Sequence, residues 1–239
     1  MYKNFLVIIV CFFILTANKP LWALSELDSS TSSPLLDRLY EWPQWSIKPS
    51  FKRLRTREDL FYPKWFEGNW EVSSLDLDDP RKRQVRHLAH FKIDSSSRVI
   101  GDRAFNSQSL GKELFGEDLI EVKDQPGSFN RQLTIFKGNK FLETKIISRE
   151  QELIDPDVFL ADEVSLQIFH DPELSRISQV ETLSLYKKCE VNQPLSESYP
   201  HPLICGDQWQ VIYPAPGDFL NSSVTKSRHY RLTFNRFRN

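Results

Sequence analysis

The sequence lacks the short motifs that mark common nucleotide, hydrolase and zinc sites. It contains no glycine-rich phosphate loop, no Gly-x-Ser-x-Gly elbow and no His-Glu-x-x-His pair. Among its five histidines only His87 and His90 lie close together in the chain. On a strand these two positions face opposite sides, so they cannot share a metal ion. We therefore expect no metal and no cofactor, and no catalytic residue stands out.

Long hydrophobic runs are also scarce. The apolar run from Phe5 to Leu15 is shorter than the roughly 20 residues needed to cross a membrane. Lys3 precedes this run, and a Leu-Trp-Ala stretch ending at Ala23 follows it, which is the order of a secretory signal peptide. We predict that residues 1–23 are a signal peptide that is removed. An uncleaved membrane anchor is the alternative.

Cysteine is rare, with three residues in the whole chain. Cys11 lies in the predicted signal, so Cys189 and Cys205 remain after processing. An exported protein meets an oxidising compartment, and this favours a disulfide between the two. The bond would close a loop of about 15 residues and stabilise the fold by roughly 3 kcal/mol on the chain-entropy model. Two free buried thiols are the alternative.

Excess charge of one sign is missing too. The formal net charge is −1, which gives no indication of a nucleic-acid partner. Two local basic clusters are expected to be solvated surfaces, with contact to anionic lipid headgroups as the less favoured reading. They consist of Lys48, Lys52, Arg53, Arg55 and Arg57, and of Arg81, Lys82, Arg83 and Arg86.

The remaining composition fits one ordinary globular domain. The chain has 239 residues, of which 40% are hydrophobic and 26% charged. Residues 24–34 are rich in serine and predict a flexible linker. Residues 35–63 are rich in aromatic side chains but interrupted by prolines, which suits neither a helix nor a strand. We predict that this aromatic segment wraps over a single domain spanning 35–239.

Alternation of apolar and polar residues dominates the rest of the chain. In residues 85–93 the apolar side chains fall on every second position, which is the period of a strand buried on one face. The same pattern recurs in Leu142, Thr144 and Ile146, in Val164, Leu166 and Ile168, and in Tyr230, Leu232 and Phe234. Turn residues separate the runs. We predict an all-β, antiparallel barrel of about eight or nine strands, closed or nearly closed.

One short helix is predicted from Ser107 to Phe115. Asn106 is a suitable N-cap and Gly116 a suitable stop. Just before it, Asp102 and Arg103 could form an ion pair that fixes the helix to the sheet.

The start of the first long strand carries a Gly-x-Trp sequence, Gly68-Asn69-Trp70. It resembles the signature of the lipocalin-like, or calycin, barrels. The resemblance implies that Trp70 closes the base of the barrel and that an arginine near the last strand packs across its ring. Strand parity with Tyr230 favours Arg228 or Arg236 for that role.

A wider resemblance covers nearly all of the mature chain. Its segments look like those of an uncharacterised protein family of cyanobacteria and plastids, a domain of unknown function. That resemblance implies a photosynthetic source and a periplasmic or thylakoid-lumen address, and it implies no catalytic residues. The segments are 57–60, 62–63, 65–66, 68–70, 99–106, 130–132, 161–163, 180–182 and 208–210.

Five residues are candidates for the interior of the barrel. His87 and Phe91 share the apolar face of one strand, where a histidine is more often part of a core than of a site. Arg103 lies at the start of the helix. Arg131 could bind an acidic headgroup or pair with Glu143 or Glu181, and the pair is favoured because an unpaired buried charge is costly.

The predicted barrel suggests three kinds of function. An interior of about eight strands can hold one small ligand, which favours a non-enzymatic carrier of a lipid or pigment. The first alternative is an assembly or interaction factor at a photosynthetic membrane complex, with a filled interior. Its contact would be the aromatic segment together with the basic stretch from Lys48 to Arg57. The second is an enzyme with Glu143 or Glu163 as acid and base.

Overall fold

The computed structural model describes residues 33–47, 59–128, 130–189, 203–215, 224 and 226–237. The predicted signal peptide, nearly all of the predicted linker and the basic cluster of residues 48–57 lie outside the described residues. Within these ranges no helix is long and apolar enough to cross a membrane.

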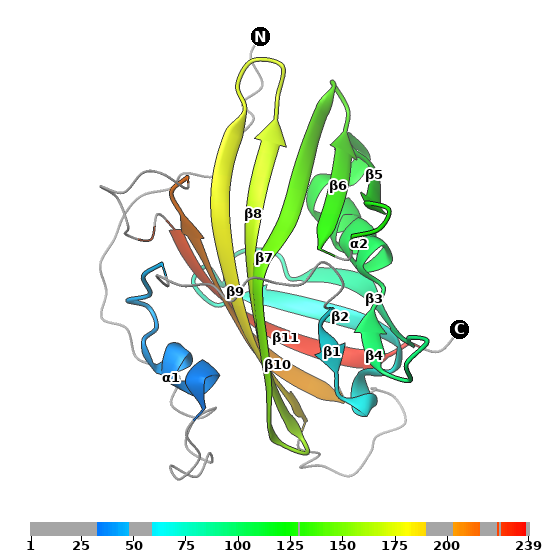
Figure 1. The fold of residues 1–239 in the computed structure, drawn as a ribbon, viewed down its shortest axis with the longest axis vertical. Helices are drawn as coiled ribbons and strands as arrows, with labels where there is room; N and C mark the ends of the chain where they lie inside the picture. The colour runs from blue at the N-terminus through cyan, green and yellow to red at the C-terminus, as the bar shows by residue number, and fades with distance from the viewer. Residues whose placement is uncertain are drawn as a thin grey trace. The chain divides into compact units, whose positions relative to one another are not determined.

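The described residues form one antiparallel sheet of eleven strands (Figure 1). The strands are β1 (Phe61–Tyr62), β2 (Gly68–Asp76), β3 (Val85–Ile93), β4 (Val99–Gly101), β5 (Leu119–Asp124), β6 (Arg131–Phe136), β7 (Lys140–Asp155), β8 (Val158–His170), β9 (Arg176–Lys188), β10 (Ile204–Tyr213) and β11 (Lys226–Arg236). Their order across the sheet is β1-β4-β3-β2-β11-β10-β9-β8-β7-β6-β5. The all-β antiparallel prediction is confirmed, but the predicted number of strands is too low. The very short β1 and β4 cannot display an alternating pattern.

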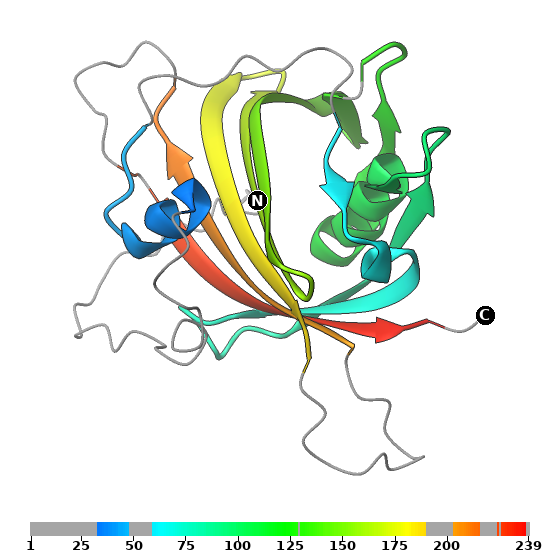
Figure 2. The same cartoon turned by 60° about the horizontal axis from the view of Figure 1, so that its bottom comes forward.

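The sheet curves into a half-barrel and does not close on itself (Figure 2). Its end strands are β1 and β5, and helix α2 (Arg103–Phe115) lies against β3 and β5. Three side chains of α2 accept hydrogen bonds from strand amides: Ser109 from Leu88 at 2.8 Å, Asn106 from His90 at 2.7 Å and Gln108 from Val122 at 2.5 Å. The helix therefore occupies the opening that a barrel would fill with paired strands.

Helix α2 begins earlier than the sequence predicted. Its N-cap is Asp102, so Asn106 is a helical residue and not the cap. The amide of Asn106 instead bonds both the N–H and the carbonyl of His90, at 2.7 and 3.2 Å. Gly116 ends the helix with a φ of 56°, as its position in the sequence predicted.

A second α-helix, α1 (Pro34–Tyr40), was not predicted. Ser33 caps it by accepting a hydrogen bond from the Leu36 amide at 3.1 Å, and proline follows at the first helical position. The buried Arg38 of this helix forms a forked ion pair with Glu181 of β9, with both N–O distances at 2.8 Å. The helix thus packs on the outer face of the sheet, and the prediction of an irregular segment is wrong for these residues.

The inner face of the sheet has an aromatic floor at one end. We define it by Phe66 and Trp70, which are 0% and 1% exposed, together with the rings packed on them. The indole of Trp70 donates to the Phe66 carbonyl at 2.6 Å, and the guanidinium of Arg236 lies 4.4 Å above its ring. Gly68 has a φ of 118°, and a side chain there would collide with Arg236. The other candidate arginine, Arg228, approaches Asp76 at 3.6 Å.

A disulfide joins two neighbouring strands beside this floor. Cys189 follows β9 and Cys205 lies in β10, and their Cα atoms are 5.2 Å apart. This is the separation that a disulfide requires. The bond links the C-terminal end of β9 to the N-terminal end of β10.

Candidate functional site

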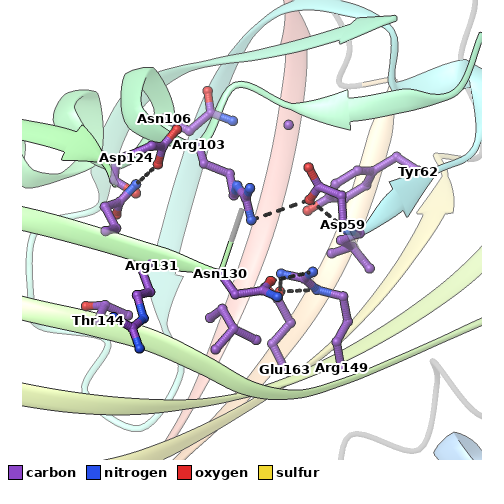
Figure 3. A pocket seen from close by; sticks show the side chains of 15 residues that line it. Asp59, Tyr62, Arg103, Asn106, Asp124, Asn130, Arg131, Thr144, Arg149 and Glu163 are labelled. Carbon is purple, nitrogen blue, oxygen red and sulfur yellow. Dashed lines mark hydrogen bonds and ion pairs between the residues drawn. The ribbon is translucent and has the colours of Figure 1, made fainter. Parts of the chain in front are cut away.

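A cavity of about 270 Å³ opens on the inner face of the half-barrel, above the aromatic floor (Figure 3). It is bounded by residues just before and within β1, by α2, and by β6, β7 and β8. Its described lining residues are Asp59, Leu60, Tyr62, Gly101, Arg103, Asn106, Ser107, Asp124, Asn130, Arg131, Gln132, Thr144, Ile146, Arg149 and Glu163. Most of these side chains are polar, which distinguishes the cavity from the aromatic floor.

Arg149 provides the fixed wall of the cavity. Its side chain is 4% exposed and holds Glu163 through two nitrogens at 2.6 Å, and a third nitrogen reaches the Asn130 amide oxygen at 3.1 Å. The register between β7 and β8 shifts between Ile146 and Ser148, which marks a bulge. Because of this extra residue, Thr144 and Arg149 face the same side of the sheet.

A second ion pair crosses the cavity. Arg103 reaches from α2 toward Asp59, which precedes β1, with an N–O distance of 3.5 Å. Figure 3 shows the two side chains extending toward each other from different elements. The Asp59 side chain is 9% exposed, so this pair also lies largely out of solvent.

Tyr62 separates the cavity from the aromatic floor. Its ring packs on Phe91 and Phe66, with centroids 4.7 and 4.9 Å apart. Burial, assisted by the nearby Tyr186 and Glu163, raises the pKa of the Tyr62 hydroxyl well above its ordinary value. The hydroxyl therefore stays protonated at neutral pH and is available to donate a hydrogen bond.

Formal charges balance around the cavity. Its described lining includes three arginines and three carboxylates. They are Arg103, Arg131 and Arg149, and Asp59, Asp124 and Glu163. Asp124 also accepts a hydrogen bond from Gln132 at 3.1 Å. The cavity can thus offer many donors and acceptors without a strong net field.

Next to the cavity, the inner face becomes apolar toward the far ends of β6, β7 and β8. We call Phe115, Phe136, Leu142 and Phe169 the apolar rim. Leu142 pairs with Phe169 across the strands, and the Phe136 ring lies 5.2 Å from Phe115 and 6.1 Å from Phe169. Phe115 is 50% exposed, so part of the apolar rim faces solvent.

Of the five predicted interior residues, only Arg103 and Arg131 line the cavity. Phe91 belongs to the aromatic core and is 6% exposed. His87 lies on the inner face away from the cavity, where burial lowers its pKa. Glu143 follows Leu142 on β7 and so points to the outer face.

Several predicted charge partners are wrong. Glu181 binds Arg38, and Glu143 pairs with His170 at 3.1 Å. Arg131 is exposed and shows no ion pair with the described residues.

At the start of α2, the ion pairs also differ from the expected one. Asp102 binds Lys92 at 2.8 Å, and Arg103 reaches Asp59. Glu143 and Glu163 lie on opposite faces of the sheet, so they cannot act as an acid and base on one substrate.

The cavity residues without a sequence-based site prediction include Asp59, Tyr62, Asn130 and Arg149. The first three occur in segments that carry the wider resemblance, and that was the available signal. Arg149 carried no such signal. Among the described residues, no group of three or more histidine, cysteine or acidic side chains is placed to hold a metal ion.

These features define an antiparallel half-barrel with a charge-balanced interior cavity. A family model described as a domain of unknown function, DUF6816, matches residues 75–238, and the chain belongs to this family. The match spans the sheet from the end of β2 and every cavity residue except Asp59, Leu60 and Tyr62. No curated protein and no solved structure matches the chain.

Proposed function

We propose that the protein is a non-enzymatic binding protein that holds one small lipid-like or pigment-like molecule on the inner face of the half-barrel. The observation that carries this proposal is the cavity of about 270 Å³ beside the apolar rim. A cavity bounded by fixed side chains on a rigid sheet is a common form of ligand site.

The size of the cavity limits how the ligand fits. Cavities that enclose a drug-sized molecule usually measure about 300–1,000 Å³. The cavity of this protein, at about 270 Å³, is slightly smaller and would enclose one end of a lipid or pigment. The remainder would lie along the inner face of β6 to β8, where the apolar rim offers contact.

Two neighbouring substitutions on β7 test the proposal. Thr144→Trp places a large ring in the cavity, whereas Lys145→Trp places it on the exposed outer face of the same strand. Protein purified from its native source is extracted with organic solvent, and the extract is analysed by mass spectrometry. We expect a stoichiometric molecule from the wild type and Lys145→Trp, and its loss from Thr144→Trp. A wild-type extract without such a molecule would contradict the proposal.

Exposed apolar side chains favour a second candidate, an assembly or interaction factor. Leu114, Phe115 and Ile120 are 53%, 50% and 54% exposed. Such residues commonly mark contact sites. If the native protein carries no ligand and Leu114→Ser releases it from a membrane fraction, this second function gains support. The basic cluster expected to make this contact lies outside the described residues.

We also propose that the protein acts in an exported compartment, the periplasm or the thylakoid lumen. The disulfide between Cys189 and Cys205 supports this, because such bonds persist in oxidising compartments. Intact-mass analysis of the native protein should then give a mature chain starting near Leu24. Recovery of the full-length chain from membranes would instead support a retained anchor.

A further inference from the structure

The two less exposed arginines of the cavity already have carboxylates beside them, whereas Arg131 lies at an exposed position. Arg149 holds Glu163 with both groups directed inward, and Arg103 faces Asp59. An additional ion beside these pairs would have to separate one of them or remain uncompensated, and both are costly because the Arg149 and Asp59 side chains are only 4% and 9% exposed. The lining thus favours a group with no net charge.

The neighbouring inner face presents amides and hydroxyls. Thr182 is the cross-strand partner of Glu163, and Gln210 is the partner of Thr182. The Gln210 amide lies 3.4 Å from the Thr182 hydroxyl, and Gln208 donates to Ser184 at 3.1 Å. Amides and hydroxyls both donate and accept hydrogen bonds, as the hydroxyls of a sugar or polyol do.

An apolar path leads away from this polar region along β7. Thr144 lines the cavity, Leu142 lies two residues earlier on the same face, and Lys140 is the first residue of the strand. Four strand residues span about 13 Å at roughly 3.3 Å each. Leu142 and Phe169 therefore lie where the tail of a molecule anchored in the cavity would pass.

We infer that the ligand is an amphiphile with an uncharged, hydroxyl-rich head group. The head lies in the cavity between Arg103 and Arg149, and the alkyl chain follows the inner face of β7 and β8 to the apolar rim. This inference rests on the proposed function and adds to it the ligand class and its orientation.

A series of amphiphiles with one decyl chain tests the head group. Decyl maltoside, decylphosphocholine, decyl sulfate and decyltrimethylammonium are titrated into the mature protein below their micelle concentrations, and binding is followed by calorimetry. We expect decyl maltoside to bind at least tenfold more tightly than the other three. Equal binding of all four, or tighter binding of a charged head, would overturn the inference.

Paired variants test the orientation. Thr144→Val removes a hydroxyl from the cavity. It should weaken the binding of decyl maltoside about fivefold, as expected for the loss of one hydrogen bond. Thr233→Val, on the outer face of β11, should leave it unchanged. Phe169→Ser should weaken the binding of decyl maltoside but not that of hexyl maltoside. The outer-face control Ile168→Ser should leave the binding of both unchanged. Thermal denaturation confirms that each variant is folded.

The outcomes separate this inference from the proposed function. If none of the four amphiphiles binds but the native protein carries a molecule that Thr144→Trp removes, the inference fails and the proposed function stands. If Phe169→Ser affects both chain lengths equally, the proposed orientation is overturned. If none of the four amphiphiles binds and the extract of the native protein contains no stoichiometric molecule, both the inference and the proposed function fail.

Discussion

At the scale of single residues, Arg149 shows what strand alternation can and cannot predict. Counting by two from Thr144 places Ile146 on the inner face and Arg149 on the outer face. The bulge after Ile146 reverses that count and turns Arg149 inward to Glu163. Bulges have no dependable signature in a single sequence. The most deeply placed charge of the cavity was therefore invisible before the structure.

His87 makes the stability of the protein depend on pH. Burial lowers its pKa in the folded state below the ordinary value of about 6.5. Below that value the unfolded chain binds a proton more readily than the folded protein, so the folded state loses stability as pH falls. The part of the folding stability that depends on neutral His87 is fully present above about pH 6.5 and is lost progressively below it.

We expect His87→Leu to reduce this dependence. Urea denaturation at pH 5.0 and 7.5 should show a smaller difference in the free energy of unfolding for His87→Leu than for the wild type. Glu113 faces His87 from α2 and opposes the shift, so Glu113→Gln should enlarge the difference. An unchanged difference in both variants would show that His87 does not titrate in this way.

At the scale of elements, the long strands could be predicted and the connecting pieces could not. The alternation in residues 85–93 corresponds to β3, and Tyr230, Leu232 and Phe234 lie on one face of β11. Two-residue β1 is too short for a pattern, and α1 was hidden by the prolines that follow it. The Ser-Pro start of α1 was the local signal that would have revealed it.

Helix α2 depends on side-chain hydrogen bonds to the sheet. Asn106→Ala would leave the N–H and carbonyl of His90 without their amide partner, and we expect a loss of about 1–3 kcal/mol. Amide hydrogen exchange at His90 should accelerate. Lys112→Ala, at an exposed position of the same helix, should change neither stability nor exchange. Unaltered exchange in Asn106→Ala would show that the helix is held by other contacts.

At the scale of the whole molecule, substitution of Trp70 tests whether the aromatic floor stabilises the fold. Trp70→Ala empties a large buried site and should destabilise the protein by about 3–5 kcal/mol. Arg236→Ala removes the cation above the ring and should cost about 0.5–2 kcal/mol. The two losses should be less than additive in the double variant, because both residues share one contact. Equal melting temperatures for Trp70→Ala and the wild type would refute a structural role for the floor.

The pairing of β2 with β11 has a consequence for how the chain folds. Tyr230 lies opposite Asp76, so two strands that are far apart in the sequence are neighbours inside the sheet. Leu232 and Phe234 of β11 complete the core around Trp70. Contacts between such distant segments form slowly because a long loop must close first. A nascent chain that still lacks β11 cannot assemble this core, so the core around Trp70 forms only after β11 has been synthesised.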